Sequence, residues 1–128
     1  MRIIVLGATG MAGTAVVNEA LSRGHEVTAV SRRRRHRAGA GVTSCLLDVT
    51  DVGSVAGLLK DSDAAVVALR PPAGHESDLV RLTEAVLDAA SRSRTPLLII
   101  GGAAPLSSPS DPGTLAIDDP TIVPPAWR

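Results

Sequence analysis

MRIIVLGATGMAG, residues 1–13, is the stretch from which the organisation of the chain follows. Its apolar, β-branched run at residues 3–6 predicts a strand, and a helical pattern continues from Met11 to Arg23. Between them Gly7, Gly10 and Gly13 stand at three-residue intervals. Glycine tolerates positive φ and carries no Cβ, while a helix N-terminus offers unpaired N–H groups at the positive end of its dipole. The stretch therefore predicts a strand, turn and helix that bind an anion such as a pyrophosphate; the alternative is a turn that merely needs small residues.

Composition restricts the class of protein. The 128 residues fit one domain, and 45% are apolar with Trp127 as the single aromatic residue, so the core must be aliphatic. Thirteen basic and thirteen acidic side chains cancel, which argues against nucleic-acid or membrane binding. The lone Cys45 excludes an internal disulfide and a cysteine metal cluster, and the three scattered histidines suggest no metal site. A cytoplasmic protein is expected.

Strand and helix patterns alternate along residues 1–103. We expect strands at 3–6, 25–30, 42–47, 63–69 and 96–100, and helices at 11–22, 51–59 and 76–91. This rhythm predicts βαβ units with right-handed crossovers. The predicted fold class is α/β, a Rossmann-type parallel sheet of about five strands in the order 3-2-1-4-5, with helices on both faces.

Residues 104–128 have a different, proline-rich character. They predict a loop with one short extended piece at 114–117, and they supply no sixth strand. One edge of the sheet is then left uncovered, which predicts a homodimer through that edge, a tail packed back on it, or poor solubility.

Five segments together resemble the atypical, NmrA-like branch of the short-chain dehydrogenase/reductase superfamily. They are VLGATGMAG (5–13), SRR (31–33), LDVTD (47–51), VVALRP (66–71) and LLIIGGAA (97–104). The resemblance covers about residues 1–120. It implies an NAD(P)-binding domain and, in many members, NADPH-dependent reduction of small carbonyl, quinone or flavin-like substrates; other members bind the cofactor as redox sensors without turnover.

Two departures from the family pattern affect the expected activity. The chain contains no Tyr, and its only Lys is Lys60, so the Tyr-x-x-x-Lys catalytic pair of the wider superfamily is absent. Members also continue well past the length of this chain, which is expected to lack their C-terminal part. The alternatives to a reductase are therefore a non-catalytic dinucleotide-sensing module and a truncated reductase, with a small-molecule substrate or none as partner.

The resemblance also implies which residues hold the cofactor. At the pyrophosphate it places Gly7, Thr9, Gly10, Met11, Ala12 and Gly13; at the adenosine it places Ser31, Arg32, Asp48 and Val49; beneath the ribose and towards the nicotinamide it places Ala68, Leu69, Arg70 and Gly101.

Ser31 and Arg32 stand where an NAD-selective enzyme places an acid. A guanidinium there can pair with a 2′-phosphate, so NADP(H) is preferred over NAD(H). The alternative, a solvated basic loop, is favoured for Arg34, Arg35 and Arg37.

Three other residues have two interpretations each. Asp48 either accepts from the adenine amino group, as the family does, or caps the next helix. Arg70 either reaches a phosphate or an acidic substrate, or faces solvent. His75 is the candidate proton donor, and the alternative is an ordinary exposed loop histidine.

Overall fold

The computed structural model describes residues 1–37 and 39–124. Every predicted strand and helix is present, and no bound differs by more than two residues. The elements are β1 (Arg2–Leu6), α1 (Met11–Ser22), β2 (Glu26–Ser31), β3 (Val42–Leu46), α2 (Val52–Lys60), β4 (Ala64–Val67), α3 (Asp78–Ser93) and β5 (Leu97–Ile99).

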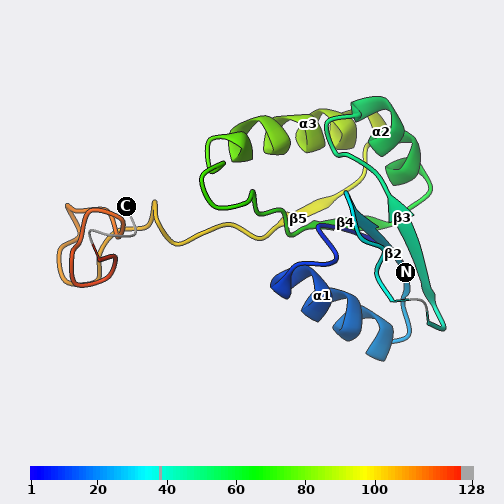
Figure 1. Ribbon diagram of the computed structural model, residues 1–128, viewed down its shortest axis with the longest axis horizontal. Helices are drawn as coiled ribbons and strands as arrows, with labels where there is room; N and C mark the ends of the chain where they lie inside the picture. The colour runs from blue at the N-terminus through cyan, green and yellow to red at the C-terminus, as the bar shows by residue number, and fades with distance from the viewer. Residues whose placement is uncertain (38, 125–128) are drawn as a thin grey trace.

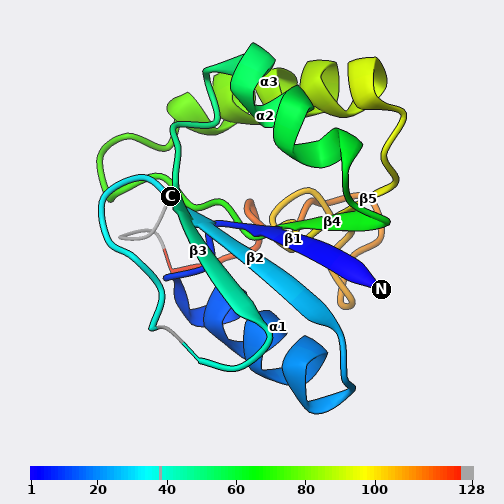
Figure 2. The ribbon, with the colours of Figure 1, turned by 90° about the vertical axis from the view of Figure 1, so that its right-hand side faces the viewer.

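The strands form one all-parallel sheet in the order β3-β2-β1-β4-β5, which confirms the predicted Rossmann topology. Helix α1 covers one face, and α2 and α3 cover the other (Figure 1). Viewed from the side in Figure 2, β3, β2, β1 and β4 lie next to one another between these two layers. The N-terminal strand β1 is central and pairs with both β2 and β4.

Alternation along β1 builds a separate aliphatic core on each face. Ile4 and Leu6 point towards α2 and α3, whereas Val5 points towards α1. Leu59 of α2 joins the first core and Val17 of α1 joins the second; both are fully buried. Burying such a side chain is worth about 1.5–3 kcal/mol, so these contacts fix the helices on the sheet.

The helix ends test one sequence prediction, the role of Asp48 as a cap. Gly24 follows α1 with φ +76°, and its N–H donates to the Leu21 carbonyl over 2.9 Å, as expected for a glycine stop. Helix α2 is capped by Asp51, whose carboxylate accepts from the Ser54 N–H over 3.1 Å. The alternative that Asp48 caps this helix is therefore wrong.

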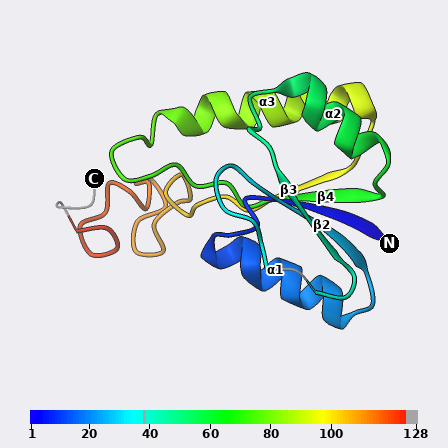
Figure 3. The same cartoon turned by 45° about the vertical axis from the view of Figure 1, so that its right-hand side comes forward.

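Residues 103–124 form a compact irregular segment beyond the carboxyl end of the sheet, joined to β5 by an extended stretch (Figures 1 and 3). The extended piece predicted at 114–117 is only one antiparallel bridge, between Ser107 and Leu115. The segment closes around the buried carboxylate of Asp119, which accepts from the Ser108, Ser110 and Thr121 hydroxyls and from the Thr121 N–H. Trp127 lies outside the described residues.

Among the described helices, none has the length and apolar character needed to cross a bilayer.

Candidate functional site

The glycine turn is built by close backbone packing. Gly7 has φ +85°, and its N–H and that of Ala8 both donate to the Val30 carbonyl over 3.0 Å. A Cβ on Gly7 would overlap the Ala68 carbonyl, and a Cβ on Gly13 would overlap the Gly7 carbonyl. A Cβ on Gly10 would lie 3.5 Å from the Gly7 carbonyl oxygen, an ordinary contact. The fold itself thus requires glycine at residues 7 and 13. It does not require glycine at residue 10, so the presence of Gly10 has a reason other than backbone packing.

The N-terminus of α1 has the chemistry of an anion site. No side chain caps it, and its first turn contains no acidic residue. Its first N–H groups, including that of Met11, therefore have no intrahelical acceptor and lie at the positive end of the dipole. Thr14 fixes the turn to the helix by donating from its hydroxyl to the Ala8 carbonyl over 3.1 Å.

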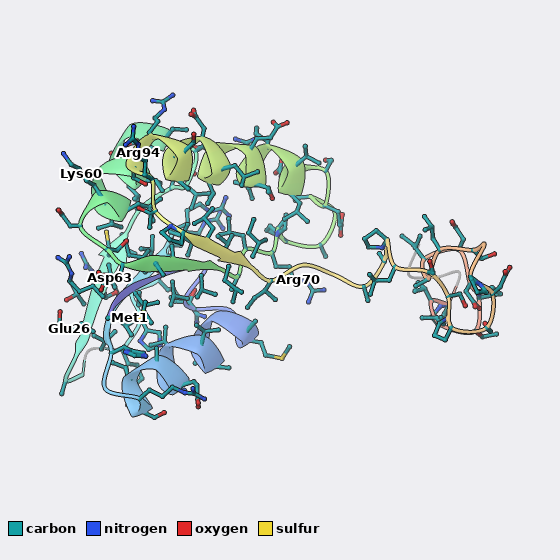
Figure 4. The ribbon with its side chains drawn as sticks, turned by 180° about the vertical axis from the view of Figure 1, so that it is seen from behind. Met1, Glu26, Lys60, Asp63, Arg70 and Arg94 are labelled. Carbon is teal, nitrogen blue, oxygen red and sulfur yellow. The ribbon has the colours of Figure 1, made fainter. Side chains whose placement is uncertain are left out.

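A cavity of about 270 Å³ opens beside this turn, at the carboxyl ends of the strands. Figure 4 shows Arg70, one of its lining residues, at the opposite end of the sheet from Met1, Glu26 and Asp63. Ten of the predicted site residues line the cavity: Gly7, Thr9, Gly10, Ser31, Arg32, Asp48, Val49, Ala68, Leu69 and Arg70. Their proposed roles towards a cofactor stay predictions.

Five other predicted residues do not line this cavity: Met11, Ala12, Gly13, Gly101 and His75. Met11 projects into solvent at the start of α1, and Gly101 lies past the end of β5. His75 is exposed, with its Nδ1 3.7 Å from a carboxylate oxygen of Asp78. The structure therefore places His75 itself outside the cavity lining, next to Asp78, which does line the cavity.

The basic loop after β2 divides into two parts. Arg32 lines the cavity, and its neighbour Ser31 is buried with its hydroxyl donating to the Arg34 carbonyl. Arg35 turns the other way, donating from Nη1 to the Ser44 carbonyl of β3 over 3.1 Å. Arg32 is thus the arginine of this loop that reaches the cavity.

Asp48 is held in a tight turn at the end of β3. Its Oδ1 accepts from the Thr50 N–H over 3.0 Å and from the Thr50 hydroxyl over 2.8 Å. These two bonds hold the pKa of the Asp48 carboxyl below its ordinary value, and the positive charges of Arg32 and Arg81 lower this pKa further. The group is a carboxylate at neutral pH and acts only as an acceptor, and its Oδ2 takes no part in the turn.

Sequence reasoning missed the part of the cavity wall that comes from α3 and its loop. Arg81 lies on this wall, with its Nη2 3.7 Å from Oδ1 of Asp78. The unpredicted lining residues are Val30, Leu47, Pro71, Pro72, Asp78, Arg81 and Leu82. The amphipathic pattern of α3 predicts its buried face but not what its polar face meets, so no sequence signal pointed to Arg81.

The residues present fit a dinucleotide in kind. The fold leaves room for a methyl group at Gly10, and the uncapped N-terminus of α1 faces the same turn. The adjoining cavity is lined by the carboxylate of Asp48 and by arginine side chains. Small-molecule sites usually enclose about 300–1,000 Å³, so this cavity is small for a whole dinucleotide.

The chain is similar to several known proteins. The uncharacterized protein YwnB of Bacillus subtilis is 33% identical over 121 residues, which are 94% of this chain and 56% of YwnB. A proposed exported protein of Burkholderia pseudomallei superposes with a TM-score of 0.79 at 32% identity, over 99% of this chain and 59% of that chain. A proposed NADH-flavin reductase of Streptococcus pneumoniae superposes with a TM-score of 0.76 at 28% identity, over 94% of this chain and 56% of that chain. The chain thus spans a little over half the length of these relatives.

The family assignment is direct. A model of the NAD(P)H-binding family matches residues 7–122, from the first glycine of the turn to the closing part of the C-terminal segment. The glycine turn, the parallel sheet and the cavity at its carboxyl edge are what such a family needs to hold a nicotinamide dinucleotide. The chain therefore belongs to the NAD(P)H-binding family, as a Rossmann domain of the atypical short-chain dehydrogenase/reductase kind.

Proposed function

We propose that the chain is the cofactor-binding part of an NmrA-like, NADPH-dependent reductase of small carbonyl, quinone or flavin-like substrates. The observation that carries the preference for NADP(H) is the end of β2, where Arg32 lines the cavity and its sequence neighbours, Ser31 and Arg33, are not acidic. A guanidinium there can form charge-assisted hydrogen bonds to a 2′-phosphate. The Streptococcus pneumoniae relative, a proposed NADH-flavin reductase, supports the reaction class.

Each part of the cofactor has residues suited to hold it. The α1 N-terminus and the turn at Gly10 suit the pyrophosphate, and Arg32 suits the 2′-phosphate. Asp48, a fixed acceptor, suits the adenine amino group, and Leu69 supplies an apolar support nearby. Arg70 would approach a phosphate or an acidic substrate from the end of β4.

The bound cofactor supplies hydride transfer, and the protein supplies position. The sequence contains no Tyr, and Lys60 lies at the other end of the sheet from Arg70 (Figure 4). In this proposal the described part of the chain binds and orients the cofactor, while the proton reaches the substrate from solvent or from His75 if the loop moves.

Fluorescence titration with NADPH and NADH tests the proposal. We expect tighter binding of NADPH, and we expect Arg32→Glu to remove that preference. Arg33→Glu is the matched control, because Arg33 is exposed in the same loop and lies outside the cavity lining. No binding of either dinucleotide, or equal binding of both by the unaltered chain, would contradict the proposal.

A second candidate function is a non-catalytic NADP(H) sensor. The position of His75 favours it, since this candidate proton donor is exposed on the surface and lies outside the cavity lining. Consumption of NADPH with a panel of quinones, flavins and aldehydes, lost in Gly10→Val, would reject it. A cytoplasmic setting without nucleic-acid or membrane partners fits the balanced charge and remains a prediction, which fractionation of the native protein would test.

A further inference from the structure

Three arginines of the loop between β2 and β3 have no role in the fold or in the proposed function. They are Arg33, Arg34 and Arg37, which are exposed and lie outside the cavity lining. Arg32 of the same loop lines the cavity, and Arg35 donates to a backbone carbonyl of β3. Within the described part of the chain, the other three guanidinium groups form no hydrogen bond or ion pair.

The loop is fixed against the edge strand β3, on its outer side (Figure 2). The Ser31 hydroxyl donates to the Arg34 carbonyl at the start of the loop. Further along, Arg35 donates from Nη1 to the Ser44 carbonyl over 3.1 Å, and the His36 N–H donates to the Ser44 hydroxyl over 3.0 Å. These bonds hold the backbone between the three free arginines in place, so a ligand would not have to order the loop.

The loop carries positive charge without a counter-charge in its own part of the chain. Residues 27–47 contain no Asp and no Glu. Four arginines elsewhere each lie within 4.0 Å of a carboxylate, namely Arg2, Arg23, Arg81 and Arg92. Since like charges held close together repel one another, the loop favours a ligand that supplies negative charge.

The residues of the loop restrict the class of that ligand. A protein partner needs apolar anchors, and residues 32–41 contain no apolar side chain larger than alanine. A single-stranded nucleic acid stacks its bases on aromatic rings, and the chain has no Tyr, no Phe and only Trp127. A duplex binder typically contacts roughly 6–10 phosphates, which is more than three arginines can reach. A small, highly charged anion fits the loop best.

We propose that Arg33, Arg34 and Arg37 bind a short chain of linked phosphate groups, either free or as the triphosphate of a nucleotide. A guanidinium forms bidentate, charge-assisted hydrogen bonds with phosphate oxygens. A phosphate chain spreads its charges along its length and can contact all three arginines, whereas a single phosphate group contacts fewer. The inference does not rest on the proposed function, because none of the three lines the cofactor cavity.

Isothermal titration calorimetry with tripolyphosphate, ATP and orthophosphate tests the site on the purified chain at low ionic strength. We expect one tripolyphosphate to bind per chain, about tenfold more tightly than orthophosphate, and to bind more weakly as salt is added. The double variant Arg34→Gln/Arg37→Gln should weaken tripolyphosphate binding about tenfold. Its melting temperature should not change, because neither side chain bonds to another described residue.

The double variant Arg23→Gln/Arg92→Gln is the matched control, because it removes the same number of positive charges outside the loop. Both arginines pair with an acid on their own helix or at its end, over 2.7 Å and 2.8 Å. We expect this variant to bind tripolyphosphate as the unaltered chain does.

ATP distinguishes the two sources of the phosphate chain. Equal binding of ATP and tripolyphosphate supports a site that also accepts nucleotides, and weaker binding of ATP supports a site for the free chain. Equal binding of tripolyphosphate and orthophosphate, or an equal loss of affinity in the two double variants, would overturn the inference. Tighter binding of an RNA oligonucleotide than of tripolyphosphate would also overturn it, since the ligand would then be a nucleic acid.

Discussion

Gly10 and Gly13 differ in what a methyl group would meet, and this difference separates folding from binding. A Cβ on Gly13 would overlap the Gly7 carbonyl, so Gly13→Ala should lower the melting temperature clearly. A Cβ on Gly10 meets only an ordinary contact at 3.5 Å, so Gly10→Ala should fold normally and lose NADPH binding at least tenfold. Thermal unfolding and NADPH titration on both variants check this. An unchanged affinity in Gly10→Ala would mean that the turn does not approach the cofactor.

At the same scale, the site shows what the sequence could and could not predict. Gly7 and Arg32 directly follow strands, and Asp48 and Leu69 each stand two residues past the end of one. Because the carboxyl ends of parallel strands share one edge, the convergence of these residues follows from topology. Arg81 follows no strand. Its place depends on how α3 packs over that edge, which is a tertiary contact that periodicity alone does not encode.

At the scale of elements, the end of α3 contains an avoidable strain. Arg94 adopts a left-handed conformation with φ +57°, where a side chain costs roughly 1 kcal/mol that glycine avoids. We expect Arg94→Gly to raise the free energy of unfolding by roughly 0.5 kcal/mol, after the entropy gained by the unfolded chain is subtracted. Chemical denaturation measures it. Gly24→Ala, at φ +76° with open space around it, is the opposite change and should destabilise; a loss of stability in Arg94→Gly would contradict this account.

Helices and strands were predictable because each carries its own signal. Helix α1 begins and ends where predicted, since the glycine turn precedes it and Gly24 follows it. Strand β4 is shorter than its apolar run, because Ala68 and Leu69 leave the sheet to form the cavity wall. The sequence pattern shows that these residues are apolar, but it does not predict that they face a cavity.

For the whole molecule, the C-terminal segment should respond to pH through Asp119. Four donated hydrogen bonds hold the pKa of this carboxyl far below its ordinary value of 3.8. Because the pKa is lowered on folding, the stabilisation is complete well above pH 3.8 and is lost as the pH falls below it. At neutral pH, Asp119→Asn should therefore speed proteolysis within residues 103–124 while leaving the melting temperature of the sheet domain unchanged. Asp111→Asn, an exposed turn acid of the same segment, is the comparison and should change cleavage much less; equal rates for the two variants would argue against this role of Asp119.

We further propose that two copies of the chain pair through β5. Within the described residues this edge strand pairs with β4 and with no other strand, and Leu98, Ile99 and Ile100 are exposed along it. The C-terminal segment does not cover this edge, because Figure 1 shows it beyond the end of the sheet. Light scattering after size exclusion should show a dimer that becomes a monomer in Leu98→Lys. A monomeric unaltered chain would reject the pairing.

The central position of β1 also sets the order in which the molecule can form. Strand β1 precedes both of its neighbours along the chain, and Ile3 pairs with Val27 on one side and with Ala64 on the other. During synthesis β1 thus lacks its second neighbour until β4 has been made, and its apolar side chains stay unprotected through that interval. Contacts so distant in sequence slow folding and leave the nascent chain open to aggregation. A sheet built around β1 must therefore wait for strands that come much later in the sequence before it can close.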